Sequence, residues 1–196
     1  MAKATPCPEK AALRVEIDKR LNALTTEEKK RQSEIVFQKL INHPWYKSAN
    51  RISLFMSTDM EVNMEPIIKH IKGRGASAFV PQYAGGKMNM LKLESDDEDT
   101  MPLTRHGIKQ HSKGQVRENA LETGGLHLII APGAAFSRSG DRCGHGGGYY
   151  DKFITNLRKD PKSAPKVVAV AFNCQVVDHV PTNELDQKVD AVLFAE

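Results

Sequence analysis

The chain has 196 residues, of which 40% are hydrophobic and 27% are charged, and its net charge is +4. This length and composition predict a soluble globular protein with one domain over residues 1–196. No apolar run approaches the roughly 18 residues that a membrane span needs, and the start of the chain lacks the apolar core of a secretory signal. We therefore expect a cytoplasmic protein that binds no membrane.

The charged residues and the cysteines exclude other classes of protein. A mild excess of lysine and arginine favours anionic ligands through its long-range field. These residues are scattered and only 6% of the chain is aromatic, so we expect no nucleic-acid partner. Cys7, Cys143 and Cys174 have no CxxC spacing, which argues against a disulfide framework and against a zinc site.

The first half of the chain alternates helical and strand patterns. Apolar residues recur every four positions over residues 9–24 and predict a helix. Thr25 and Glu28 have the spacing of a capping box and open a second helix, which Pro44 ends. The further elements that we expect in this half are a strand over 51–56, a helix over 64–72, and strands over 77–80 and 88–93.

The second half continues the alternation after an acidic loop at 95–100. Residues 126–131 form the strongest apolar strand pattern, and a long glycine-rich loop at 132–148 joins it to a helix over 149–159. Two more buried strands are expected, over residues 167–172 and 191–195. Because strands alternate with helices and several strands are apolar on both faces, we expect an α/β domain with a mostly parallel, helix-flanked sheet.

Glycines crowd the turn between the strongest strand and the following helix. Glycine lets the backbone turn sharply and approach a ligand, and the N–H groups that open a helix favour phosphate. The segment matches neither a Walker A loop nor the dinucleotide-binding fingerprint, so it indicates a phosphate or another anion without identifying it. A merely flexible loop is the alternative. The glycines are Gly140, Gly144, Gly146, Gly147 and Gly148.

Charged residues near this turn could complete an anion site. Asp151 in the first turn of the next helix could bind Mg²⁺, which takes one or two carboxylates at phosphate sites, or could only favour the helix dipole. Asp186 and Asp190 are the candidates for a second carboxylate. Lys10 and Arg14, four positions apart, lie on the same side of the first helix. They could clamp a phosphate or could form a solvated face.

Two residues in predicted loops have side chains suited to a flat, donor-rich ring. Glu61 lies between the strand at 51–56 and the next helix, and Tyr83 follows the strand at 77–80. A carboxylate accepts hydrogen bonds from ring N–H groups, and a tyrosine offers a stacking face. A solvated Glu61 and a locally packed Tyr83 are the alternatives.

Five segments in chain order follow one pattern. They are KxxLR from Lys10 to Arg14, RISLFM with Glu61 five residues on, FVPQY, PGxAFxxxGxRxGxGxGYYD and VPTNELDQKVDAVL. Together they resemble the 5-formyltetrahydrofolate cyclo-ligase family, whose members are also called methenyltetrahydrofolate synthetases. The resemblance covers nearly the whole chain, and its most specific part is the glycine-tyrosine-aspartate block.

The resemblance implies a fold and a set of site residues. The fold would be a three-layer α/β/α single domain with a mostly parallel sheet, like that of phosphosugar isomerases and CoA-transferases, and we expect a monomer. Lys10, Arg14 and Tyr149 would be catalytic. The nucleotide would contact Lys10, Arg14, Arg142, Cys143, Gly144, His145, Gly146, Gly147, Gly148, Tyr149 and Tyr150. The folate would contact Met56, Glu61, Tyr83, His145, Gly146, Gly147, Gly148 and Tyr149, and Mg²⁺ would be bound by Asp151 and Asp186.

The implied reaction converts 5-formyltetrahydrofolate to 5,10-methenyltetrahydrofolate, with ATP as co-substrate and ADP and phosphate as products. The formyl oxygen would attack the γ-phosphate, N10 would then attack the activated carbon, and phosphate would leave. Two other functions stay open on the residues alone. One is a non-catalytic module that binds folate or nucleotide, and the other is an enzyme like the phosphosugar isomerases or CoA-transferases.

The chain departs from the family pattern at two places. Some relatives carry arginine and lysine where this chain has His145 and Gly147, which reduces the positive charge near the phosphates. Relatives often have an acidic or amide residue and then proline after a central isoleucine, whereas here Ile108 precedes Lys109-Gln110-His111. The contacts of this middle loop therefore cannot be carried over from the family.

Overall fold

A six-stranded sheet forms the centre of the computed structural model, which describes residues 7–196. The strand order is β3-β2-β1-β4-β7-β9. All neighbouring strands run parallel except β3, which pairs antiparallel with β2. The mostly parallel sheet is therefore confirmed. The strands are β1 (Arg51–Ser53), β2 (Ser77–Ala84), β3 (Lys87–Lys92), β4 (Leu128–Ala131), β7 (Lys166–Val170) and β9 (Ala191–Leu193).

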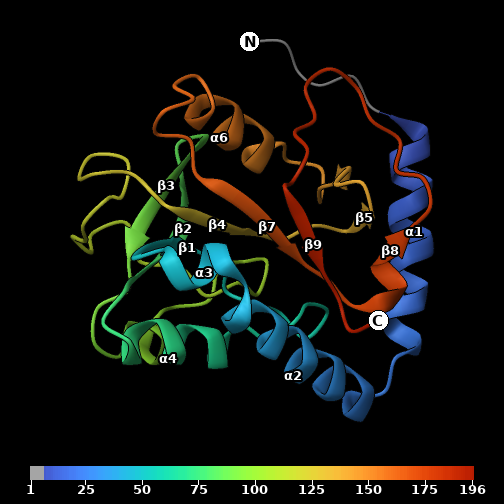
Figure 1. The fold of residues 1–196 in the computed structure, drawn as a ribbon, viewed down its shortest axis with the longest axis horizontal. Coiled ribbons are helices and arrows are strands. Elements are labelled where there is room, and N and C mark those ends of the chain that lie inside the picture. The colour runs from blue at the N-terminus through green and yellow to red at the C-terminus, as the bar shows by residue number, and fades with distance from the viewer. Residues whose placement is uncertain (1–6) are drawn as a thin grey trace.

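Helices cover both faces of this sheet, as the expected three-layer fold requires. In Figure 1, α6 lies above the sheet, and α2, α3 and α4 lie below it. α1 runs along one end, where it contacts β5 and η1. The helices are α1 (Pro8–Ala23), α2 (Thr26–Asn42), α3 (Pro44–Ser48), α4 (Glu65–Gly73), α5 (Asp97–Thr100) and α6 (Tyr149–Leu157), with a 3-10 turn η1 (Asn173–Gln175).

Each face of the sheet has its own apolar core. In β4, Leu128 and Ile130 point into the core shared with α1 to α4, whereas Ile129 and Ala131 point into the core shared with α6. Side chains alternate between the faces of a strand, so a central strand covered on both sides is apolar at every position. This explains why the sequence of β4 is one uninterrupted apolar run.

A second, three-stranded sheet corrects the expectation of one long loop over 132–148. Its order is β6-β5-β8, formed by β5 (Ala135–Ser137), β6 (Arg142–Cys143) and β8 (Val176–Val177). β5 and β6 pair antiparallel, and β8 joins from a distant part of the chain. Strands of two or three residues are too short to show a recognisable period in the sequence. They are held instead by strand pairing and by burial of residues such as Phe136.

Several other predicted bounds differ from the structure. β1 stops at Ser53, whereas β2 continues to Ala84 because it pairs with β3 to its end. The expected acidic loop at 95–100 is wrong in part, since the short helix α5 forms there around buried Asp97. At the start of α2, the Glu28 N–H donates to Thr25 Oγ1 at 3.1 Å, which confirms the predicted cap.

Four expectations concern the whole chain. No helix within residues 7–196 has the length and apolar character needed to cross a membrane. The expectation about a secretory signal rests partly on residues 1–6, which lie outside the described residues. The single domain over 1–196 and the monomeric state stay predictions.

Candidate active site

The glycine-rich turn before α6 has a backbone that requires glycine. Gly146 has a φ of 113° and Gly148, the N-cap of α6, has a φ of 66°. Side-chain-bearing residues rarely adopt these values. At Gly147 an added Cβ would lie 2.8 Å from Cδ2 of Tyr149, so the Tyr149 ring packs directly on the turn. The glycines themselves place no side chain over the backbone of the turn, and the first N–H groups of α6 follow directly after it.

The predicted pair on α1 reaches this turn from the far end of the chain. Arg14 Nε donates to the carbonyl oxygen of Gly144 at 2.7 Å. Lys10 is only 8% exposed, and its ammonium group forms an ion pair with Asp186, 176 residues away. The alternative of a solvated face is thus wrong for Lys10. The first helix is fixed to both the glycine turn and the C-terminal loop.

Asp151 and Asp186 approach the same place through adjacent contacts. Asp151 Oδ2 accepts from Arg142 Nη2 at 3.0 Å, and its Oδ1 accepts from the backbone N–H of Gln187 at 3.0 Å. Asp186 Oδ2 accepts from the Asn183 N–H at 2.7 Å in addition to Lys10. The backbone contact at Gln187 therefore holds Asp151 beside the loop that carries Asp186.

Asp190, the other candidate for a second carboxylate, has a different position. Its Oδ2 accepts from the backbone N–H of Val167 at 2.7 Å, and Nη2 of Arg158 lies 3.6 Å away. These contacts hold the start of β7 and the end of α6 together. Between the two alternatives, the structure brings Asp186 and not Asp190 to Lys10 and Arg142.

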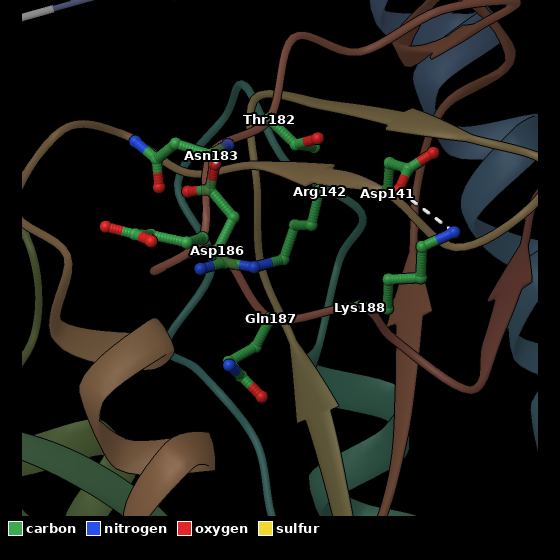
Figure 2. Close-up of a pocket in the computed structure, with 8 residues that line it drawn as sticks. Asp141, Arg142, Thr182, Asn183, Asp186, Gln187 and Lys188 are labelled. Atoms are coloured by element: carbon green, nitrogen blue, oxygen red, sulfur yellow. Dashed lines mark hydrogen bonds and ion pairs between the residues drawn. The ribbon is translucent and has the colours of Figure 1, made fainter.

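A cavity of about 250 Å³ lies between the β5–β6 turn and the C-terminal loop, as Figure 2 shows. Asp186 and Arg142 both line it, and Lys188 Nζ lies 3.2 Å from Asp141 Oδ1 at its other end. Its lining consists of Asp141, Arg142, Thr182, Asn183, Glu184, Asp186, Gln187 and Lys188.

The sequence predicts a binding role for only two of these lining residues, Arg142 and Asp186. The signal for the others is weak, because the segment TNELDQK belongs to the family pattern but offers only its aspartate as a candidate ligand. Asn183 and Gln187 act through their backbone N–H groups, which a sequence pattern does not single out. A polar loop flanking a candidate metal ligand is the one feature that could have indicated them.

A second cavity, of about 90 Å³, lies on the other side of Arg142. The rings of Tyr83 and Tyr149 meet edge to face across it, with centroids 4.9 Å apart. Burial, together with the carboxylate of Glu61, raises the pKa of Tyr83 to about 12. Tyr83 therefore carries its proton at neutral pH and can donate a hydrogen bond. The lining is Tyr83, Pro132, Arg142, Gly144, His145, Gly147, Gly148, Tyr149 and Tyr150.

Two buried polar atoms at this second cavity lack partners within residues 7–196. They are the hydroxyl of Tyr150 and Nε of Arg142. Burial raises the pKa of Tyr150 well above its ordinary value, so the hydroxyl stays neutral. An unsatisfied buried donor costs about 1–3 kcal/mol, so such atoms mark places where a ligand can supply the partner.

Glu61 does not line the second cavity itself but approaches His145, which does. Its Oε2 accepts from the N–H of Thr58 at 2.9 Å and from the Thr58 hydroxyl at 3.1 Å. Its Oε1 lies 3.7 Å from Nε2 of His145, which belongs to the glycine turn. Met56 belongs to the same β1–α4 connection but packs against the core and lines neither cavity. The structure thus brings Glu61 to the glycine turn through His145.

Cys143 is the predicted nucleotide-binding residue whose side chain points away from both cavities. It is fully buried in the core that includes α1, and burial raises the pKa of its thiol. Its carbonyl oxygen accepts from the Ala134 N–H at 2.8 Å. Cys143 therefore supports the β5–β6 hairpin from beneath, with Arg142 and Gly144 on either side facing the cavities.

The two carboxylates suit a magnesium ion that is shared with phosphate. Within residues 7–196, no three His, Cys, Asp or Glu side chains are grouped so that they could hold a metal unaided. Mg²⁺ at phosphate sites takes one or two carboxylates and completes its shell with phosphate oxygens and water. Asp151 and Asp186 are each partly exposed, at 14% of the side chain, and fit that incomplete set.

Comparisons with known proteins agree with this arrangement. The model of the 5-formyltetrahydrofolate cyclo-ligase family matches residues 6–195. A 5-formyltetrahydrofolate cyclo-ligase of Mus musculus is 41% identical over 199 residues, covering 100% of this chain and 98% of the mouse protein. A probable 5-formyltetrahydrofolate cyclo-ligase of Caenorhabditis elegans is 36% identical, covering 94% of this chain and 92% of its own length.

Solved structures support the same conclusion for the fold. The Aquifex aeolicus 5,10-methenyltetrahydrofolate synthetase superposes with a TM-score of 0.76 at 26% identity, covering 94% of this chain and 88% of that one. A Mycoplasma pneumoniae 5,10-methenyltetrahydrofolate synthetase gives a TM-score of 0.73 at 19% identity, which is similarity of fold alone. The family model and the animal relatives each cover nearly the full length. The chain belongs to the 5-formyltetrahydrofolate cyclo-ligase family.

Proposed function

We propose that the protein converts 5-formyltetrahydrofolate to 5,10-methenyltetrahydrofolate, using ATP and releasing ADP and phosphate. The observation that carries the proposal is the meeting of cations from α1 and β6 with two carboxylates at the glycine turn before α6. Phosphoryl transfer depends chiefly on positioning and on neutralising charge. A site made of backbone N–H groups, cations and carboxylates is suited to that task.

The larger cavity and the glycine turn would bind the nucleotide. The N–H groups at the start of α6 would donate to phosphate oxygens, and the helix dipole would favour their negative charge. Lys10 and Arg14 reach the turn from α1, and Arg142 lies between the two cavities. Arg142 would therefore lie where the γ-phosphate meets the folate. Lys10, Arg14 and Tyr149 keep their proposed catalytic roles.

Asp151 and Asp186 would hold a magnesium ion. This ion would neutralise charge on the transferred phosphoryl group. The surroundings of the two carboxylates suit a cation, because each carboxylate already accepts a hydrogen bond from a cationic side chain. Binding of Mn²⁺ with an ATP analogue, followed by electron paramagnetic resonance, would test this; Asp186→Asn with an unchanged signal would remove Asp186 from the metal site.

The smaller cavity would bind the pterin end of the folate. Tyr83 and Tyr149 would provide aromatic contacts, and the Glu61 carboxylate would accept from ring N–H groups. Met56 would contact the formyl group from the same connection as Glu61. A volume of about 90 Å³ is small for a drug-sized ligand, which occupies roughly 300 Å³ or more. Tyr149 would therefore turn away from Tyr83 when the folate enters.

In the proposed reaction, the residues of the site orient two substrates and form no covalent bond to either. The formyl oxygen attacks the γ-phosphorus and the bond from phosphorus to the ADP oxygen breaks, which gives ADP and an imidate-like phosphate. N10 then attacks the formyl carbon and loses its proton, and the bond from this carbon to the phosphate oxygen breaks, so that the phosphate leaves and the proton is released with it. Arg14 and Arg142 would hold phosphoryl oxygens during both steps.

The test is a turnover assay that reads the near-ultraviolet band of the methenyl product. Purified protein is mixed with 5-formyltetrahydrofolate and Mg-ATP, and a matched sample lacks ATP. Growth of the band only with ATP supports the proposal. Binding of both substrates without turnover would indicate a non-catalytic module, and no binding of either would favour an isomerase- or transferase-like enzyme.

We also propose that the active form is a monomer in the cytoplasm. The contacts that bring Lys10, Arg14 and Arg142 to the candidate site are all formed within one chain, which supports a monomer. Sedimentation at the protein concentration of the assay measures the oligomeric state. An active species with the mass of a dimer would contradict it. Fractionation of cells that express the native chain tests the cytoplasmic location. Activity confined to an organelle would contradict it.

A further inference from the structure

The end of β2 depends on a glutamine for its main-chain partners. β1 ends at Ser53, opposite Phe79, whereas β2 continues to Ala84. Beyond Phe79, no strand within residues 7–196 lies beside the edge of β2 that faces β1. Gln110 replaces one there: its Oε1 accepts from the Tyr83 N–H at 3.0 Å, and its Nε2 donates to the Tyr83 carbonyl at 3.3 Å. One side chain thus satisfies both backbone groups of Tyr83.

A reciprocal contact fixes the backbone next to Gln110. Nε2 of Gln82 donates to the carbonyl oxygens of His111 at 3.3 Å and Ser112 at 3.1 Å. Gln82 is 6% exposed and His111 is 1% exposed, so the bond to His111 is buried, and the bond to Ser112 is partly buried. Buried hydrogen bonds are costly to leave unmade. β2 and the loop from Gln110 to Ser112 therefore hold each other in one register.

A second contact, between Arg117 and Asp97, holds the other end of this loop, away from Tyr83. Arg117 donates to Asp97 through Nε at 2.8 Å and through Nη2 at 2.7 Å. The Asp97 side chain is 6% exposed, so this ion pair is shielded from water. With both ends of the loop fixed, the position of the Gln110 amide is set by the fold. It does not depend on a ligand.

Tyr83 is the residue whose orientation this arrangement controls. Its ring lines the smaller cavity and meets Tyr149 edge to face. None of the residues that line the larger cavity comes from β2 or from the loop with Gln110. A disturbance at Gln110 would therefore act first on the smaller cavity, through Tyr83, and would not touch the residues that line the larger cavity.

We propose that Gln110 is a positioning residue that sets the affinity for 5-formyltetrahydrofolate by fixing the backbone of Tyr83. The inference rests on the proposed function, because it assigns the folate to the cavity beside Tyr83. It also gives a role to the loop at Ile108–His111, where the chain departs from the family pattern.

The test compares two glutamines of the same loop. Gln110→Met removes both bonds to Tyr83. Gln115→Met makes the same chemical change but removes contacts to Asp97 and His111 only. By calorimetry, Gln110→Met should weaken binding of 5-formyltetrahydrofolate roughly five- to tenfold, the effect of losing one to two net hydrogen bonds. Binding of a non-hydrolysable ATP analogue should stay within twofold in both variants.

Two further measurements separate positioning from a general loss of stability. Gln110→Glu keeps an acceptor for the Tyr83 N–H but loses the donor, so its folate affinity should lie between those of wild type and Gln110→Met. Hydrogen exchange at the Tyr83 amide, measured without ligand, should accelerate in Gln110→Met and stay unchanged in Gln115→Met.

Three outcomes would overturn the inference. Wild-type folate affinity in Gln110→Met would do so, and so would an equal loss of folate and nucleotide binding. An equal effect of Gln115→Met would show that the loop only stabilises the fold. A wild-type protein that binds the ATP analogue but no 5-formyltetrahydrofolate would instead overturn the proposed function, and with it the role given to Gln110.

Discussion

Replacing Asp151 by asparagine tests whether the carboxylate has a structural role besides its proposed role at the metal. In the structure its two oxygens accept from two different donors, Arg142 Nη2 and the Gln187 N–H, each at 3.0 Å. An asparagine has one acceptor oxygen and no charge. Asp151→Asn therefore leaves one donor unpaired and leaves the guanidinium of Arg142, which is 3% exposed, without its counter-charge.

The expected cost follows from these contacts. Removing one partner of a buried ion pair costs about 3–5 kcal/mol, and leaving one buried donor unmatched costs about 1–3 kcal/mol. Arg142 keeps its bond to the Pro132 carbonyl at 3.0 Å, and the amide keeps one acceptor, so we expect about 2–3 kcal/mol. For a chain of this size that lowers Tm by roughly 4–12 °C. A first-turn carboxylate, judged from sequence alone, would contribute only about 0.3–1 kcal/mol.

Chemical denaturation measures this free energy of unfolding directly. The set comprises wild type, Asp151→Asn, Arg142→Met and the double variant, with the exposed Asp18→Asn on α1 as matched control. If the pair is coupled, the double variant should be less destabilised than the sum of the two single variants. Asp151→Asn within about 0.5 kcal/mol of wild type, the ordinary effect of a surface change, would refute the reasoning.

Three more predictions concern other parts of the molecule. Glu61→Ala should weaken folate binding more than ATP binding, measured by calorimetry, and equal losses would count against a pterin contact. Gly140→Ala should lower the unfolding free energy by about 2 kcal/mol or more, since φ is +95° and the new Cβ would lie 2.3 Å from a carbonyl oxygen. The Arg117 guanidinium lowers the pKa of Asp97 from 3.8 to about 2. The pair therefore stabilises the fold above about pH 4, and this contribution is lost as the pH falls towards 2. Arg117→Met should remove that part of the acid dependence in pH-dependent denaturation, and an unchanged profile would contradict it.

The sequence predicts elements whose signal lies within one segment. The apolar run of β4 and the periodic pattern of α1 each lie within one short stretch of the chain, and their bounds differ by one or two residues from the structure. β5, β6 and β8 were missed because two or three residues carry no period. Their pairing across about 40 residues, from Phe136 to Val176, is a tertiary contact that no local pattern records.

The same limit applies to the site. The motif around the glycine turn identified Arg142 and Asp151, but not that they form a buried pair with each other. Lys10 and Asp186 were assigned to different ligands, although they are ion-paired in the structure. Side-chain pairing of this kind depends on how α1, β6 and the C-terminal loop pack together. Residue identity alone does not determine it.

These ion pairs explain how one small region can hold several charges of both signs. A buried charge without a partner costs several kcal/mol, so Lys10 and Arg142 are stable in the fold because Asp186 and Asp151 face them. A magnesium–nucleotide complex contains both signs of charge. Lys10 and Arg142 would turn to its phosphate oxygens, and the two aspartates would turn to its cation. Metal-free nucleotide would satisfy the cations and leave the carboxylates unpaired. The paired arrangement therefore favours the complex over nucleotide alone, and this preference follows from electrostatics without any further residue.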